Sequence, residues 1–204
     1  MDQSLLEGGK VLRITRWGES VMHTPTEPIT EFDDELRELI RDMFATMYAA
    51  DGVGLAATQV GVSKAVFIYD CPDEDNVRQR GVFCNPKVTL PEGRDRNLEG
   101  AEEGCLSLPG GFQNLHRPDR ATCTGQDETG APIEVVGTGL LARCLQHETD
   151  HLNGIVFGDR LAARGRKKLY QQHESLAHRY PDDWPVTPKT ASAVTDQAED
   201  EPSA

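Results

Sequence analysis

Apolar residues recur at intervals of three and four between Asp33 and Tyr48, and this spacing predicts an amphipathic helix. The apolar stripe consists of Leu36, Leu39, Ile40, Met43, Phe44 and Met47. Thr30 and Asp33 supply a capping start, and Gly52 supplies a stop signal. We expect the stripe to pack into the core, and we assign it no chemistry.

The middle of the chain contains short runs that are β-branched or alternate between apolar and polar residues, and these runs predict strands. They cover residues 64–70, 81–90, 120–125 and 132–137, with Pro, Gly and Asp clusters between them. The tetrapeptide DETG at 127–130 predicts a hairpin turn between the last two strands.

Two further helices are predicted after the strands. Thr138–Gly154 has helical character and is longer than most strands, and Arg160–Tyr180 is a third helical stretch. The strands are grouped between helices and show no β-α-β alternation. We therefore predict an α+β fold, with small antiparallel sheets packed around a central helix and with amino-terminal and carboxy-terminal helices.

The length of 204 residues suits one domain of ordinary size, which we place at residues 1–180. Residues 181–204 are rich in Pro, Ser, Ala and acidic residues. Such a segment buries too little apolar surface to offset the entropy of ordering, so we expect this tail to be disordered.

The net charge of -13 argues against general binding to nucleic acid, and we expect no DNA partner. The amino-terminal residues lack the features of a secretory signal, and no stretch is long enough to span a bilayer. We therefore expect a cytoplasmic protein with no membrane partner. The five cysteines form no CxxC pair, which argues against a disulfide scaffold or a zinc ribbon.

The sharpest local signal is the motif HETDH at residues 147–151. His147 and His151 lie one helical turn apart, so both imidazoles can bind one metal ion, and Glu148 can act as a base beside them. The alternative is a helix with two surface histidines. Leu145 and Leu152 on the flanks favour a mostly buried helix, in which the histidines need a partner such as a metal.

A catalytic divalent metal commonly has three protein ligands and one water, so the third ligand distinguishes the families. The position at which a metzincin needs its third His is Phe157, which argues against that family. Glu174 stands at about the separation used by thermolysin-like zinc peptidases, although a surface ion pair suits it better. Cys105, a soft thiolate donor, is the better candidate, but taken alone it could equally be an inert buried cysteine.

Three segments together resemble peptide deformylase. They are GVGLAATQ at 52–59, EGCLS at 103–107 and QHETDHLNG at 146–154, and their order and separations fit that family. The resemblance extends from about Val11 to Leu161. It implies a metal-dependent hydrolase that removes the N-formyl group from the formyl-methionine of newly made polypeptides and releases formate.

The resemblance also implies roles for individual residues. Cys105, His147 and His151 match the metal ligands, and the ion would be Fe²⁺, with Zn²⁺, Ni²⁺ or Co²⁺ also compatible with these donors. Glu148 matches the acid/base, while the Gln59 side chain and the Leu106 backbone N–H match the donors to the oxyanion.

The substrate site is implied in the same way. Gly52, Val53 and Gly54 match the segment that pairs with the peptide as an added strand, and Val53, Leu106 and Cys144 would line an apolar pocket for methionine. Three departures from the family pattern point to a shifted substrate preference. Thr149 stands at a usually apolar position, Arg143 replaces an aliphatic pocket residue, and the run 110–120 lacks a substrate-binding arginine.

Two alternatives to the enzyme stay open from the sequence: a thermolysin-type zinc metallopeptidase that uses Glu174, and a non-catalytic ribosome-associated relative. The basic stretch 160–179 bears on the second of these. We interpret it first as a solvated helix face, because charge runs usually are, and second as a docking surface for the ribosome.

Overall fold

The computed structural model describes residues 1–191, and its architecture is α+β as predicted. Five antiparallel strands form the larger sheet in the order β1-β2-β3-β6-β7, and β4 pairs with β5 in a separate two-stranded sheet. The strands are β1 (Gly54–Ala56), β2 (Val66–Pro72), β3 (Arg78–Thr89), β4 (Leu98–Gly104), β5 (Phe112–Pro118), β6 (Arg120–Gln126) and β7 (Pro132–Thr138).

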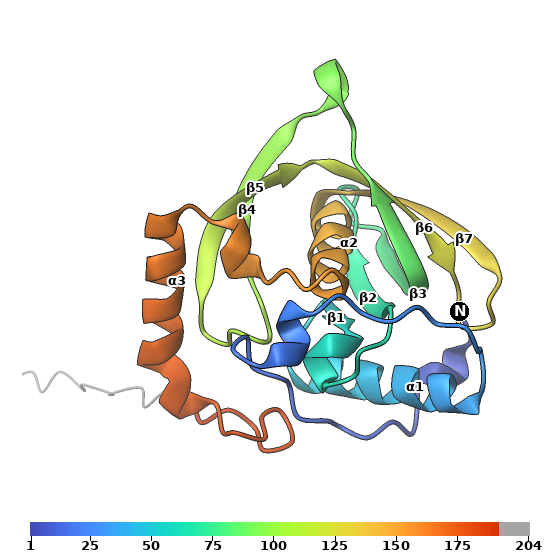
Figure 1. Cartoon of the computed structure of the whole chain (residues 1–204), viewed down its shortest axis with the longest axis horizontal. Helices are drawn as coiled ribbons and strands as arrows, with labels where there is room; N and C mark the ends of the chain where they lie inside the picture. Colours follow the sequence, from blue (N-terminus) through green and yellow to red (C-terminus); the bar gives the residue numbers. More distant parts are fainter. Residues whose placement is uncertain (192–204) are drawn as a thin grey trace, which may run out of the picture.

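Three α-helices surround or enter these sheets. They are α1 (Asp34–Ala49), α2 (Gly139–Leu152) and α3 (Ala163–Leu176). Short 3₁₀ helices cover Gln3–Leu6, Ser20–His23, Ala57–Val60, Gly93–Asp95, Phe157–Arg160 and Ala177–Arg179. Figure 1 shows α2 at the centre of the molecule, α3 at its outer edge and the β3–β4 connection projecting from the body.

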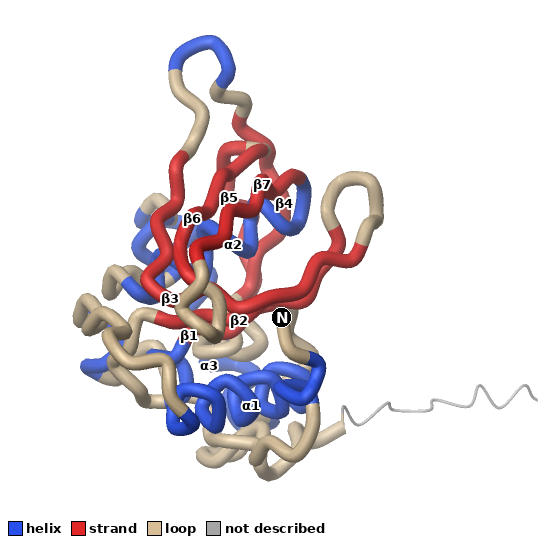
Figure 2. The backbone as a smooth tube through the Cα atoms, turned by 90° about the vertical axis from the view of Figure 1, so that its right-hand side faces the viewer, coloured by secondary structure: helices blue, strands red, loops and turns tan. Residues whose placement is uncertain are grey.

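The strand β2 explains why the core has two layers. Its residues are buried on both faces: Val66 and Ile68 point into the cluster that contains the apolar stripe of α1, whereas Phe67 and Tyr69 point into the cluster that contains α2. The larger sheet therefore lies between α1 and α2, and Figure 2 shows α1 along one side of the strands.

The helix α2 is the most enclosed of the three, since eleven of its fourteen residues are buried. It ends before Gly154, whose backbone has a φ of +71°. A Cβ atom at this glycine would lie 2.8 Å from the backbone carbon of His23, so glycine allows both the left-handed turn and the close packing. No helix in residues 1–191 is long and apolar enough to cross a bilayer.

The fold differs from the sequence prediction in three places. Strands β1, β4 and β5 were not predicted, and α3 ends at Leu176 rather than near Tyr180. The predicted tail boundary is too early, because Trp184 is only 3% exposed and the Ile14 N–H donates to its carbonyl oxygen at 2.9 Å. The remainder of the predicted tail, 192–204, lies outside the described residues.

Candidate active site

Three side chains converge where α2 faces the loop after β4. Cys105 Sγ lies 3.3 Å from His151 Nε2, which lies 3.1 Å from His147 Nε2, and the ligand atoms of all three are within 4.8 Å of one another. All three residues are buried. Convergent sulfur and imidazole donors at these separations fit one divalent metal ion.

The electrostatics of this cluster also favour a cation. Burial opposes a charge on His147, but Cys105 and Glu103 outweigh it and raise the pKa of the imidazole well above its ordinary value. Burial and the neighbouring His147 lower the pKa of His151, which therefore stays neutral, as a ligand must. A metal ion would replace the proton that the cluster otherwise holds.

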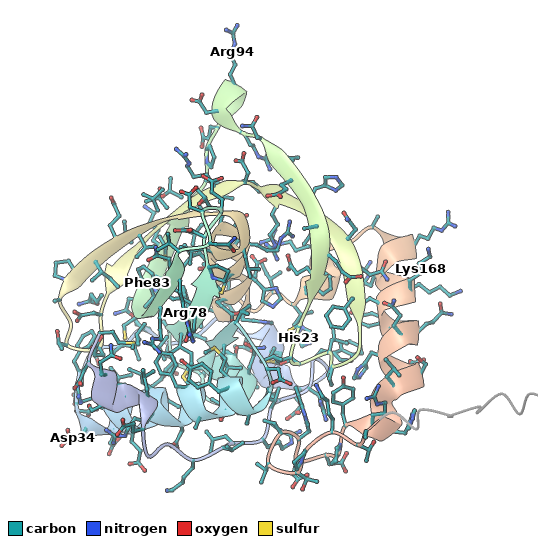
Figure 3. All side chains as sticks on the ribbon, turned by 180° about the vertical axis from the view of Figure 1, so that it is seen from behind. His23, Asp34, Arg78, Phe83, Arg94 and Lys168 are labelled. Carbon is teal, nitrogen blue, oxygen red and sulfur yellow. The ribbon has the colours of Figure 1, made fainter. Side chains whose placement is uncertain are left out.

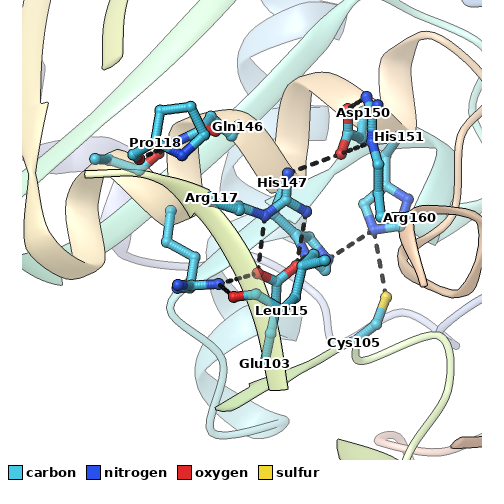
Figure 4. A network of polar contacts seen from close by, with 12 residues as sticks. Glu103, Cys105, Leu115, Arg117, Pro118, Gln146, His147, Asp150, His151 and Arg160 are labelled. Carbon is cyan, nitrogen blue, oxygen red and sulfur yellow. Dashed lines mark hydrogen bonds and ion pairs between the residues drawn. The ribbon is translucent and has the colours of Figure 1, made fainter. Parts of the chain in front are cut away.

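The carboxylate of Glu103 orients the first histidine (Figure 4). Its Oε1 lies 2.7 Å from His147 Nδ1 and accepts a hydrogen bond from Arg117 Nη2 at 2.7 Å. Its Oε2 accepts from Arg117 Nε and from Arg143 Nη1, both at 2.8 Å. Because Nδ1 of His147 is occupied in this way, the Nε2 atom is left to face the metal position.

The same network reaches the end of the ligand helix. Arg117 Nη1 donates to Asp150 Oδ2 at 3.0 Å, and Arg160 Nε donates to the same oxygen at 3.0 Å. Asp150 and Glu103 each lie in a motif that the sequence singled out, but no role was predicted for either. Arg117 lies in no motif, and only the fold brings it to both carboxylates.

Glu148 lies beside the ligands with a free carboxylate oxygen. The residue is 4% exposed, and Oε2 is buried without a hydrogen-bond partner among residues 1–191. Burial raises the pKa of this carboxyl to about 7. A Cβ atom at Gly54 would lie 2.6 Å from Glu148 Oε1, so a glycine there lets the strand approach the carboxylate.

The amide of Gln59 is fixed toward the cluster. Its Oε1 accepts a hydrogen bond from the Ala56 N–H at 2.9 Å, which directs Nε2 toward Cys105 Sγ at 3.7 Å and Ser107 Oγ at 3.4 Å. Gln59 is 1% exposed. A buried amide donor therefore stands next to the convergent ligands.

Known proteins are similar to this chain in sequence and in fold. The family model for polypeptide deformylase matches residues 11–167. Peptide deformylase 1 of Streptomyces avermitilis is 51% identical over 176 residues, which cover 86% of this chain and 81% of that protein. The chain belongs to the polypeptide deformylase family.

Solved structures of peptide deformylases are similar to this chain in fold. An actinonin complex of a peptide deformylase from Synechococcus elongatus is 41% identical with a TM-score of 0.71, covering 82% of this chain and 90% of that one. A peptide deformylase from Legionella pneumophila is 36% identical with a TM-score of 0.73, covering 84% and 99%.

The predicted substrate-binding residues all line one cavity of about 360 Å³. Its lining includes Gly52, Val53, Gly54, Leu106 and Cys144, together with Gln59, Cys105, His147 and Glu148. Val53 is 41% exposed. Its carbonyl oxygen accepts from the Asp70 N–H at 2.9 Å and from Cys144 Sγ at 3.6 Å, so β2 and α2 hold Val53 in place.

The residues that depart from the family pattern behave differently from one another. Arg143 lines the cavity, but its guanidinium is bound to Glu103, to Leu115 O at 3.0 Å and to Glu99 O at 3.0 Å. Its apolar stem is therefore the part that faces the cavity. Thr149 is half-buried with no partner for Oγ1 in the described chain, and nothing in the structure explains it.

Glu174, the ligand of the thermolysin-type alternative, is not part of the site. It is exposed on α3. The one group of potential metal ligands found among residues 1–191 contains Cys105 instead. Arg160, which we counted in the solvated basic stretch, is bound to Asp150 and is partly structural.

Proposed function

We propose that this chain hydrolyses the N-formyl group on the formyl-methionine of newly made polypeptides, releasing formate, and that it does so in the cytoplasm. The observation that carries the proposal is the convergence of Cys105, His147 and the buried His151 at the wall of a cavity that Gln59 and Glu148 also line. Ordinary zinc peptidases with the HExxH motif have no comparable use for the Cys105 thiolate.

Cys105, His147 and His151 would hold one divalent metal ion, for which we propose Fe²⁺, with Zn²⁺, Ni²⁺ or Co²⁺ as substitutes that suit the same donors. When bound, such an ion supplies a Lewis acid and lowers the pKa of water. Glu103 holds His147 in the tautomer that binding requires.

Glu148 is the proton carrier of the proposed reaction. Its carboxylate takes a proton from the attacking water and then gives that proton to the departing amine of methionine. In the metal-free site burial raises the pKa of this carboxyl to about 7, and a raised pKa suits a group that must both take and give a proton.

Two donors stabilise the oxyanion that forms at the formyl oxygen. One is Gln59 Nε2, which the bond from Ala56 to Gln59 Oε1 keeps pointed at the site. The other is the Leu106 N–H, which has no hydrogen-bond acceptor within residues 1–191. Donors fixed in advance need no reorganisation when charge develops.

The peptide binds along the segment before and within β1. Within residues 1–191 this strand pairs only with β2, so its other edge is available to accept the substrate as an added strand. Gly52 and Gly54 keep that edge close to the ligands, while Val53, Leu106 and Cys144 contribute apolar surface for the methionine side chain.

The test is formate release from a formyl-Met peptide by anaerobically purified protein, together with metal analysis. We expect Glu148→Ala to lose about a hundredfold to ten-thousandfold in activity while keeping its metal. Gln59→Ala should lose about a hundredfold to a thousandfold in kcat. Cys105→Ser should lose metal, and Glu174→Gln should retain it. Absence of formate release by the wild-type protein would refute the function.

Docking on the ribosome is a second, separate proposal for the basic stretch 160–179. Its support is that Arg164, Lys167 and Lys168 are exposed on α3, and Figure 3 shows Lys168 directed away from the body. Replacing Arg166, Lys167 and Lys168 with Glu should reduce co-sedimentation with ribosomes, and unchanged co-sedimentation would remove the idea.

A further inference from the structure

The last part of the described chain, residues 180–191, folds back over the amino-terminal residues; we call it the carboxy-terminal segment. Arg16 Nη2 donates to Pro181 O at 2.8 Å, and the Ile14 N–H donates to Trp184 O at 2.9 Å. Backbone that is bound at several consecutive points is fixed in position. The carboxy-terminal segment is therefore part of the folded domain.

Side-chain packing fixes the same segment. The rings of Tyr180 and Trp184 are 5.2 Å apart at an angle of 86°, and the Arg16 guanidinium lies 5.7 Å from the Trp184 ring centre. Leu106, which follows the ligand Cys105, packs against the same core cluster as these two rings.

The segment reaches both sides of the catalytic cavity. Near its start, Tyr180 lies against the turn between β4 and β5, where a Cβ at Gly110 would be 3.4 Å from the ring. Near its end, Lys189 Nζ donates to Asp51 Oδ2 at 3.3 Å, next to the glycine that begins the substrate strand. Tyr180, Trp184 and Lys189 all line the cavity that contains Glu148.

We propose that the carboxy-terminal segment is a wall of the substrate-binding site, and that Tyr180 contacts the peptide side chains that follow formyl-methionine. This inference rests on the proposed deformylase function. The match to the family model ends at residue 167, so it does not include this wall.

The chemistry of the wall indicates which peptides it selects. The 3%-exposed Trp184 packs edge-on against the half-buried Tyr180 ring and holds it at the cavity, where the more exposed tyrosine can meet substrate. Because Asp51 neutralises the Lys189 ammonium, charge contributes little to selection there. A rigid aromatic ring favours apolar and aromatic side chains over glycine or aspartate.

The experiment compares formyl-Met peptides in which the second or the third residue is Gly, Leu, Phe or Asp. We expect the wild-type protein to favour Phe and Leu over Gly at one of these positions by about twofold to tenfold in kcat/KM, mainly through KM. Tyr180→Ala should reduce that ratio to near one, and Tyr180→Phe should restore it.

The matched control is His178→Ala, two residues away and exposed outside the cavity, which should keep the wild-type ratio. Thermal unfolding confirms that each variant is folded. An unchanged ratio in folded Tyr180→Ala would overturn the proposal. So would an equal loss on all peptides, which would indicate a structural role for Tyr180.

If the proposed deformylase function is wrong, the wild-type protein will release no formate from any peptide, which distinguishes this outcome from a failure of the wall proposal alone. Binding can still be measured in that case. The chain has two tryptophans, Trp17 and Trp184, so a Trp17→Phe variant reports on the wall alone. Peptides ending in Phe should reach half of the Trp184 fluorescence change at a lower concentration than peptides ending in Gly. Equal half-maximal concentrations for the two peptides would overturn the proposed contact with Tyr180.

Discussion

Two acidic residues with buried carboxylates support the cavity from different sides, Glu103 through its side chain and Asp70 through its backbone, and two arginines bind each carboxylate. Glu103 in β4 contacts the ligand His147. Asp70 in β2 supports the substrate strand, because its backbone N–H donates to Val53 O. The side chains of both acids are almost fully buried, at 4% and 1% exposure.

The arginines around these two acids differ in their access to water. Arg117 and Arg143, which bind Glu103, are 7% and 10% exposed. Arg78 and Arg80, which bind Asp70, are 69% and 29% exposed. Loss of the acid therefore strands buried charges at the metal side but returns a guanidinium to solvent at the substrate side. The metal side is thus the less tolerant of change.

Glu103→Ala should have the largest effect on stability, because Arg143 would stay buried without a counter-ion and Arg117 would keep only Asp150. We expect a loss of about 3–5 kcal/mol in the free energy of unfolding, measured by urea denaturation. Metal affinity should also fall by about tenfold to a hundredfold, since His147 loses its orienting partner. The neighbouring exposed residue gives the control Glu102→Ala, which should leave both quantities unchanged.

Lowering the pH should remove part of the stability that the Glu103 carboxylate contributes. Burial opposes ionisation of Glu103, but hydrogen bonds from Arg117 and His147 outweigh it and hold the pKa of the carboxyl well below its ordinary 4.5. The ionised carboxylate therefore stabilises the fold above the unfolded pKa, and this contribution is lost as pH falls through the lower folded pKa.

The measurement is the urea midpoint of metal-free wild type and Glu103→Ala between about pH 5 and pH 2. The difference between the two proteins should narrow toward the acid end. A constant difference across that range would mean that the charge of Glu103 is not what stabilises the fold.

The Glu103 network also shows what the sequence could and could not predict. The ligand helix and the α1 stripe were predicted because their apolar residues repeat with the helical period. Strand β4, with the sequence LEGAEEG, was missed because most of it is exposed and it shows no apolar alternation. Arg117 was missed with it, because the strand register places it opposite Glu99, and no local pattern in the sequence links it to Glu103.

The carboxy-terminal wall was missed for another reason. Average composition predicted disorder for 181–204, and a single buried aromatic residue hardly changes an average. Trp184 nevertheless packs with Tyr180 in the core cluster under α1. One large buried side chain, together with backbone bonds to residues far away in the sequence, orders a segment that composition alone would leave free.

Arg143→Met should lower the free energy of unfolding less than Glu103→Ala does, because it keeps the apolar stem and removes only the guanidinium. The carbonyl oxygens of Leu115 and Glu99 lose a buried donor, while Glu103 keeps Arg117. We expect a loss of about 1–3 kcal/mol in urea denaturation. Arg143→Lys should not recover it, because one ammonium cannot replace the planar fork. Full recovery by lysine would show that charge alone matters here.

Asp70→Asn should have the smallest effect, although the side chain it changes is as buried as Glu103. Arg78 is released to water, and Tyr48, which donates to Asp70 Oδ2 at 2.6 Å, can still donate to the amide oxygen. We expect a loss of about 1 kcal/mol or less, and it should shrink further in about 1 M salt, which screens exposed charges. The loss in Glu103→Ala should be nearly independent of salt, because its charges are buried. Equal losses, or equal salt dependence, would show that exposure of the arginines does not explain the difference between the two carboxylates.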